Sequence, residues 1–206
     1  MIAVVDYGMG NLRSVSKALE KVGATVEVTD EADKIKEAAA VVLPGVGAFE
    51  EAMQGLRCRG LLRPVVQSIQ EGKPFLGICL ALQLLFTESE EGGRHKGLGI
   101  LEGKVKRFPH RVKTPHIGWN SIKKCAPAGG LSTILKQMPD VSYFYFDHSY
   151  YVEPEDESVV ATTTEYGVRF ASSVAKGNIF ACQFHPEKSE KLGLELLKNF
   201  TESVLC

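Results

Sequence analysis

The sequence predicts an α/β fold in a single domain: an open, mostly parallel central sheet flanked by helices, with an added antiparallel portion. A length of 206 residues with 44% hydrophobic residues suits one compact domain covering residues 1–206. In the first half, short apolar segments alternate with helical ones, which is typical of a parallel sheet with right-handed crossovers. In the second half, several β-prone segments follow one another and supply the antiparallel portion.

The first strand is expected at residues 2–6, because I-A-V-V-D is the apolar run that a buried parallel strand requires. Residues 7–11, Y-G-M-G-N, indicate a glycine turn. They make a weak dinucleotide-binding motif, because Arg13 stands where the third glycine belongs. A helix follows and ends at Gly23, with apolar residues recurring at helical spacing: Leu12, Val15, Leu19 and Val22.

The remaining elements are expected from the same patterns. In the first half they are a strand at 25–28, a helix at 31–37, a strand at 39–43, a turn at 44–47, helices at 49–56 and 61–70, and a strand at 75–78. In the second half they are an exposed loop at 88–99, a strand at 105–108, a loop at 115–120, a β-prone segment at 143–152, strands at 159–164, 168–174 and 179–184, and a helix at 189–204.

Charge and cysteine content narrow the class of protein. The net charge is -1 and like charges form no long block, so nothing points to nucleic acid or to an anionic membrane. The chain has neither a basic leader nor a long apolar run, and we expect a cytoplasmic protein. An odd number of widely spaced cysteines argues against a disulfide framework or a zinc site, and no metal or cofactor is expected: Cys58, Cys79, Cys125, Cys182 and Cys206.

The most informative stretch is residues 75–86, F-L-G-I-C-L-A-L-Q-L-L-F, in which the period changes from strand to helix at Cys79. This pattern predicts a nucleophile elbow, a sharp turn that exposes one side chain between a strand and a helix. Gly77 and Ala81 are the small neighbours that such a turn needs. The first N–H groups of the helix would favour a thiolate there. The alternative interpretation is a buried structural cysteine.

Groups suited to catalysis also follow two other predicted strands. His185, Pro186 and Glu187 follow the last strand, so a base and a carboxylate that can orient it emerge there. The P-G-V-G segment at 44–47 follows another strand, and its backbone N–H groups could form an oxyanion hole, although the same letters also suit an ordinary turn. A cysteine nucleophile, a histidine and a glutamate together predict thiol hydrolase chemistry.

Several motifs resemble those of known enzymes. G-I-C-L-A-L-Q (77–83) and Q-F-H-P-E (183–187) are similar to motifs of the class I (triad) glutamine amidotransferases. Five further motifs resemble those of one branch of this family, the glutaminase subunits of imidazole glycerol phosphate synthase: D-Y-G-M-G-N-L, P-G-V-G-A-F, P-H-I-G-W-N, H-S-Y and H-P-E-K-S. The resemblance covers essentially the whole chain and implies a flavodoxin-like sheet order.

The resemblance implies a role for each matching residue. Cys79 would attack the side-chain amide of glutamine and form a thioester, His185 would move the proton, and Glu187 would orient His185. The oxyanion hole would be formed by the backbone of Val46, Gly47 and Leu80. The two ends of glutamine would be held by Gln83, Glu91, Ser149 and Tyr150.

The resemblance also implies a partner. In this family the ammonia passes to a (β/α)8-barrel cyclase (HisF-type) subunit, which makes imidazole glycerol phosphate and AICAR in histidine biosynthesis. The candidates for the heterodimer interface or the ammonia gate are Asn11, Trp119, Tyr145 and Lys188. An exposed loop tryptophan suits an interface anchor, and a core position is the alternative for Trp119.

One position departs from the family pattern. Glycine usually stands where this chain has Ala81, two residues after the nucleophile. An extra methyl group there could shift the elbow. Ala81 supports one alternative, a partner-binding subunit with a weakened glutaminase. A second alternative, independent of Ala81, is a class I amidotransferase of another synthase or a free-standing thiol hydrolase.

Overall fold

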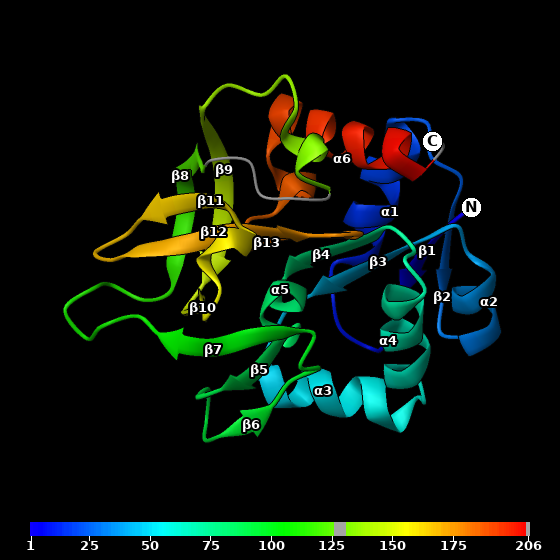
Figure 1. Cartoon of the computed structure of the whole chain (residues 1–206), viewed down its shortest axis with the longest axis horizontal. Helices are drawn as coiled ribbons and strands as arrows, with labels where there is room; N and C mark the ends of the chain where they lie inside the picture. The colour runs from blue at the N-terminus through cyan, green and yellow to red at the C-terminus, as the bar shows by residue number, and fades with distance from the viewer. Residues whose placement is uncertain (126–130, 205–206) are drawn as a thin grey trace.

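The computed structural model describes residues 1–125 and 131–204, whose strands form one continuous sheet (Figure 1). The centre of the sheet is parallel, in the spatial order β2 (Val26–Thr29), β1 (Ile2–Val5), β3 (Ala40–Gly45), β4 (Phe75–Cys79) and β13 (Ile179–Cys182). In chain order, helices connect β1 to β2, β2 to β3 and β3 to β4, and a long segment of the chain connects β4 to β13, as expected for a parallel sheet. The expected fold class is confirmed.

The second half of the chain extends this sheet with mainly antiparallel strands. Beyond β13 the order continues with β12 (Arg169–Lys176), β10 (Tyr150–Pro154), β7 (Leu101–Arg107), β5 (Phe86–Ser89) and β6 (His95–Lys96). A branch leaves β12 through β11 (Val160–Glu165), β8 (His116–Lys124) and β9 (Val141–His148). The β5–β7 pair is parallel, whereas β8 and β9 form a long antiparallel pair.

Helices cover both faces of the parallel sheet. One face packs against α1 (Leu12–Lys21) and α6 (Glu190–Val204), and the other against α2 (Ala32–Glu37), α3 (Phe49–Cys58), α4 (Leu62–Gln70) and α5 (Leu80–Leu84). Three short 3-10 helices complete the described elements: η1 (Leu131–Leu135), η2 (Glu157–Val159) and η3 (Pro186–Lys188). Among the described helices, none has the length and apolar character needed to cross a bilayer.

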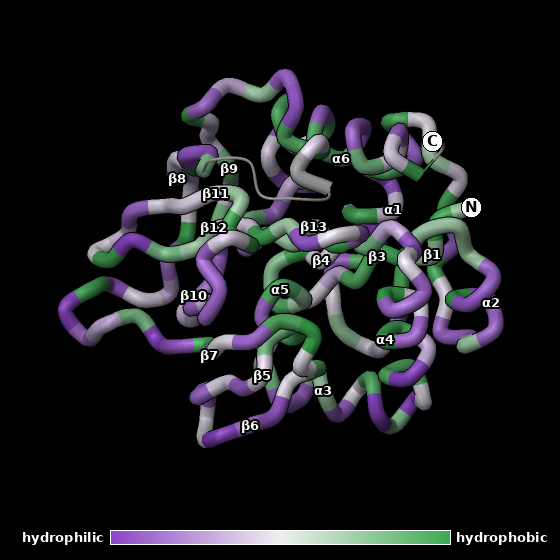
Figure 2. Tube along the Cα trace, viewed as in Figure 1, coloured by the Kyte–Doolittle hydropathy of each residue, from purple (hydrophilic) through white to green (hydrophobic). Residues whose placement is uncertain are grey.

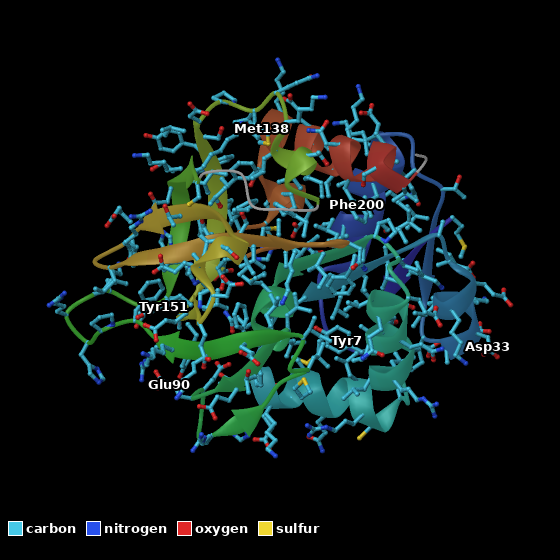
Figure 3. All side chains as sticks on the ribbon, in the orientation of Figure 1. Tyr7, Asp33, Glu90, Met138, Tyr151 and Phe200 are labelled. Atoms are coloured by element: carbon cyan, nitrogen blue, oxygen red, sulfur yellow. The ribbon has the colours of Figure 1, made fainter. Side chains whose placement is uncertain are left out.

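The two faces of the sheet have separate hydrophobic cores because side chains alternate along each strand. In β1, Ala3 and Val5 belong to the core under α3 to α5, whereas Ile2 and Val4 belong to the core under α1 and α6. Figure 3 shows a member of each core, Tyr7 and Phe200, on opposite sides of the sheet. Figure 2 shows hydrophobic residues concentrated along the central strands and hydrophilic residues at the periphery, as in α2 and β6.

Two segments expected to be loops contain strands. Residues 88–99 include the end of β5 and all of β6, and residues 115–120 belong almost entirely to β8. The first has a polar composition because β6 is an edge strand with much of its surface in solvent. The second is inverted: His116 is buried and Ile117 is exposed, so the polar residues face inward and the usual strand pattern is hidden.

The turn before the elbow starts later than expected, and the helix after the elbow is short. Strand β3 continues through Pro44 and Gly45, where it pairs with the end of β4, so the turn begins only at Val46. Helix α5 ends at Leu84 after five residues, and the chain enters β5 at Phe86. Cross-strand hydrogen bonds therefore decide both ends, overriding the local preference of proline, glycine and leucine.

Candidate active site

Three strand ends meet at one edge of the sheet. In the parallel register Gly45 of β3 lies beside Cys79 of β4, and Cys182 of β13 lies beside Ile78. The segments that follow β3, β4 and β13 therefore emerge side by side, at the carboxyl edge where open α/β sheets carry their sites. They bring together Val46 and Gly47, Cys79, and His185, as the sequence predicted.

The elbow at Cys79 has the strained backbone of a nucleophile turn. Cys79 has φ 57° and ψ -110°, a region that side-chain-bearing residues rarely occupy, and it is the N-cap of α5. A side chain at Gly45 would not fit beside this turn, because its Cβ would lie 2.9 Å from the backbone nitrogen of Ala81 and from Leu80 Cβ. Gly45 on the neighbouring strand β3 thus permits the close approach, and the buried Ala81 methyl fits within it.

His185 and Glu187 form a buried pair next to the elbow. His185 Nδ1 lies 2.8 Å from Glu187 Oε1, and their side chains are only 2% and 1% exposed. Burial lowers the pKa of His185, but the charge of Cys79, hydrogen bonds to Cys79 and Glu187, and the charge of Glu187 outweigh burial and raise that pKa to about 10. The arrangement therefore favours a charged imidazole at His185.

The backbone of His185 is anchored to β9. Its N–H donates to the carbonyl of Tyr145 over 2.9 Å, and the hydroxyl of Ser189 donates to the His185 carbonyl over 2.6 Å. The same hydroxyl accepts from the N–H of Tyr145 at 3.0 Å. Ser189 and Tyr145 therefore hold His185 in place independently of its side chain.

A cavity of about 240 Å³ opens above Cys79. Its lining contains every residue predicted for the oxyanion hole and for glutamine binding, with Cys79 and His185: Val46, Gly47, Leu80, Gln83, Glu91, Ser149 and Tyr150. It also contains three residues that were not predicted: Pro115, Asp147 and His148. Polar groups from four separated parts of the chain thus surround the sulfur, which is the composition that a small polar substrate requires.

Glu91 connects two walls of this cavity. Its Oε2 accepts a hydrogen bond of 2.8 Å from the backbone N–H of Phe49, the first residue of α3. A carboxylate at a helix N-terminus is favoured by the unpaired N–H groups there. Its own N–H donates to the hydroxyl of Ser89 at 3.2 Å. This double attachment places the carboxylate next to the segment that carries Val46 and Gly47.

Sequence reasoning missed a chain of buried polar groups behind the cavity. Gln83 Nε2 donates to the carbonyl of Tyr150 at 3.1 Å and to Gln183 Oε1 at 3.0 Å, and Gln183 Nε2 lies 3.7 Å from Cys79 Sγ. The carbonyl of Asp147 lies 3.8 Å from the same sulfur. The available signal was a glutamine next to the apolar run I-F-A-C, because a polar side chain buried there needs a partner.

Two histidines extend this chain: His148, which also lines the cavity, and His116. His148 Nδ1 donates to the Tyr150 carbonyl at 2.7 Å, and His148 Nε2 lies 2.9 Å from His116 Nδ1. Asn120 Nδ2 donates to His116 Nε2 at 3.2 Å. Burial lowers the pKa of His148 to about 3 and that of His116 to about 4, so both rings are neutral. They are buried histidines whose ring nitrogens have hydrogen-bond partners.

The interface candidates gather on a different surface. Trp119 is 49% exposed on β8, and its ring meets the Tyr145 ring edge-on at 6.3 Å. Lys188 Nζ lies 5.5 Å above the same tyrosine ring. Asn11 occupies the N-cap position of α1 without a side-chain capping hydrogen bond, and α1 packs against η3. Trp119 thus lies on a strand and is exposed, so both the expected loop and the alternative core position were wrong.

Each cysteine among the described residues has a free thiol. Cys58, Cys79, Cys125 and Cys182 are free, and Cys206 lies outside the described residues. Burial raises the pKa of Cys182 well above its usual value. Within residues 1–125 and 131–204, no cluster of three or more metal-binding side chains occurs.

Comparison with known proteins identifies the family. A family model described as "Glutamine amidotransferase class-I" matches residues 3–204.

The chain belongs to the class I glutamine amidotransferases.

This glutamine amidotransferase is 52% identical to imidazole glycerol phosphate synthase subunit HisH of Moorella thermoacetica over 203 residues, which cover 98% of the chain and 95% of the relative. It is 55% identical to the HisH subunit of Aquifex aeolicus over 200 residues, covering 96% and 94%. Among solved structures, a crystal structure of a glutamine amidotransferase superposes with a TM-score of 0.76 over 100% of both chains at 19% identity. PurLQS from Thermotoga maritima gives 0.75, over 99% of this chain and 96% of that chain, at 19% identity.

Proposed function

We propose that the whole chain acts as one glutaminase domain in the cytoplasm, hydrolysing glutamine to glutamate and ammonia through a thioester on Cys79. The ammonia then passes to a (β/α)8-barrel cyclase subunit of imidazole glycerol phosphate synthase. One observation carries the catalytic part of this proposal: Cys79, His185 and Glu187 are aligned at two adjacent strand ends beside a polar cavity. The high identity to HisH subunits over nearly the whole chain supports the choice of synthase.

In the first half-reaction, the Cys79 thiolate attacks the side-chain amide carbon of glutamine. Because Nδ1 of His185 is engaged by Glu187, Nε2 is the nitrogen that faces the reaction. The oxyanion that forms would be stabilised by backbone N–H groups of Leu80 and of the segment containing Val46 and Gly47. The C–N bond then breaks, the leaving nitrogen takes the proton from Nε2, and ammonia departs from a thioester.

In the second half-reaction, a water molecule attacks the thioester carbonyl and gives a proton to Nε2 of His185. The C–S bond breaks, glutamate leaves, and the thiolate returns beside the protonated imidazole. Glu187 stabilises that charge through its contact with Nδ1, which is the role that its nearly complete burial against His185 suits.

The remaining residues of the cavity would hold the two ends of glutamine. Gln83 and Tyr150 are linked by a hydrogen bond and present one polar wall, with Ser149 beside them. Glu91 is one of two carboxylate residues in the lining, with Asp147, and its side chain suits the α-ammonium group of the substrate. Because its Oε2 also accepts from Phe49 N–H, binding there would connect the substrate to the oxyanion segment.

The partner would dock on the exposed face of the β8–β9 pair. Four large hydrophobic side chains are exposed there and share this face in the paired register: Ile117, Trp119, Val141 and Tyr143. An apolar group of this kind indicates a protein-binding surface, with tryptophan and tyrosine as typical anchors. Tyr145, on the same face, accepts the backbone hydrogen bond from His185, so docking occurs next to the catalytic base. Ammonia released at Cys79 would enter the partner without passing through solvent.

The test is glutamate release from glutamine by the purified chain, alone and with a purified cyclase and its nucleotide ligand. We expect turnover in the complex that disappears in Cys79→Ala. The matched control is Cys182→Ala, which removes a buried cysteine on the adjacent strand and should retain turnover.

Two outcomes would contradict the proposal. A complex that forms but releases no glutamate would make this chain a binding subunit with an inactive elbow. Free glutamine hydrolysis without any complex would mean that another synthase, or none, is the partner.

A further inference from the structure

Gln183 is a buried side chain next to the nucleophile that the proposed reaction does not use. It is fully buried, follows β13 in the chain, and its Nε2 lies 3.7 Å from Cys79 Sγ. The triad and the oxyanion segment account for the nucleophile, the base, its orienting carboxylate and the N–H donors. A side-chain amide directed at the sulfur from behind is an additional group.

The orientation of this amide follows from its neighbours. The Tyr150 carbonyl can only accept, so the atom of Gln83 that lies 3.1 Å from it is the donor nitrogen. That nitrogen also lies 3.0 Å from Gln183, which must present its oxygen there. The N–H₂ end of Gln183 therefore faces Cys79. His148 Nδ1 donates to the same Tyr150 carbonyl at 2.7 Å, which helps to hold in place the carbonyl that Gln83 contacts.

The sulfur has two contacts that suit different protonation states. The Asp147 carbonyl at 3.8 Å can accept only from a protonated thiol. The Gln183 N–H can donate to either form, but donors bind an anion more strongly than a neutral acceptor. The neutral sulfur of a thiol or a thioester is a poor hydrogen-bond acceptor. The Gln183 contact is therefore strongest when Cys79 is a thiolate, before attack and again when the C–S bond breaks.

We propose that Gln183 is a catalytic residue that donates a hydrogen bond to the Cys79 thiolate and is held in that orientation by Gln83 and the Tyr150 carbonyl. It forms no covalent bond and moves no proton. Since Gln83 also lines the substrate cavity, the position of the sulfur is connected to the wall that holds glutamine. This inference rests on the proposed thioester chemistry at Cys79.

The experiment measures alkylation of Cys79 by iodoacetamide as a function of pH, followed on the Cys79 peptide by mass spectrometry. We expect Gln183→Met, which keeps the length but lacks a donor, to shift the alkylation profile to higher pH by about one unit. Its rate at pH 7 and the turnover in the complex should each fall about tenfold, the effect of losing one modest hydrogen bond to an anion.

Gln183→Glu is the second variant, because it keeps the size of the side chain. A carboxylate directed at the sulfur should shift the profile further than Gln183→Met. The matched control is Ser172→Ala on β12, which removes another fully buried polar group and should leave the profile unchanged.

The proposal is overturned if folded Gln183→Met and Gln183→Glu both give the wild-type alkylation profile. A shifted profile in variants of a chain whose wild-type complex releases no glutamate would support the Gln183 contact and refute the proposed function. The two ideas can therefore fail separately.

Discussion

Gly45→Ala tests whether the close packing around the elbow sets the position of the nucleophile. Gly45 ends β3 directly beside Cys79, and its backbone conformation is open to alanine. The added Cβ would lie 2.9 Å from three atoms: the backbone nitrogen of Ala81, Cβ of Leu80 and the hydroxyl oxygen of Tyr7. Two of these atoms belong to the first residues of α5, so the methyl group pushes directly on the helix that follows Cys79.

The size of the effect follows from these distances. Ordinary contacts of a Cβ begin at 3.4 Å, so each 2.9 Å contact is short by at least 0.5 Å, and α5 must move by a similar amount. Inserting a methyl group into a packed core costs about 1–3 kcal/mol of folding free energy. A displacement of about 1 Å in a catalytic group can cost about 10²-fold in rate, so a shift of about half that size should cost about tenfold.

Two measurements check this expectation. Urea unfolding gives the loss of stability, and glutamate release by the complex gives the loss of turnover, with iodoacetamide alkylation of Cys79 as a readout that needs no partner. The control is Gly23→Ala, at the end of α1, where the backbone is left-handed but no atom lies within 4 Å of the added Cβ. It should lower stability by about 1 kcal/mol through strain and leave turnover unchanged. Wild-type turnover and stability in Gly45→Ala would refute the reasoning.

Three further predictions concern other parts of the site. Glu187→Gln removes the buried charge beside His185, so we expect a lower pKa for that histidine and a fall in turnover of at least about 10²-fold, measured from the pH dependence of glutamate release; an unchanged profile would contradict it. Trp119→Ala removes an exposed anchor and should weaken cyclase binding about 30-fold in calorimetry while leaving alkylation of the nucleophile unchanged; unaltered affinity would place the interface elsewhere. Because burial lowers the pKa of His148 to about 3 and of His116 to about 4, the unfolded chain binds more protons below about pH 6.5, and stability falls with acidification. Between pH 7 and pH 5 the loss should be about 2 kcal/mol per histidine in urea unfolding, and titration of either ring near pH 6.5 in NMR spectra of the folded chain would disprove it.

The sequence predicted the parts of the site that local patterns encode. The change of period at Cys79 predicted the elbow, and the apolar runs around residues 2–6 and 39–43 predicted the parallel strands. Because parallel strands end at one edge, the segments carrying Cys79 and His185 could be expected to meet. The roles of Gln83, Glu91, Ser149 and Tyr150 came from motif resemblance rather than from pattern, and the structure places all four around the cavity.

Tertiary structure alone decided the position of strand β8 and the contacts between buried polar side chains at the site. Strand β8 was hidden because its polar residues, His116 and Asn120, find partners inside while Trp119 is outside, and only pairing with β9 makes such an inverted strand stable. Likewise, Gln183 meets Cys79 across adjacent strands, 104 residues apart in the chain. Hydrophobic periodicity reports which side of its own element a residue faces. Which polar groups then satisfy one another depends on strand order and register, and these are set by contacts between distant segments.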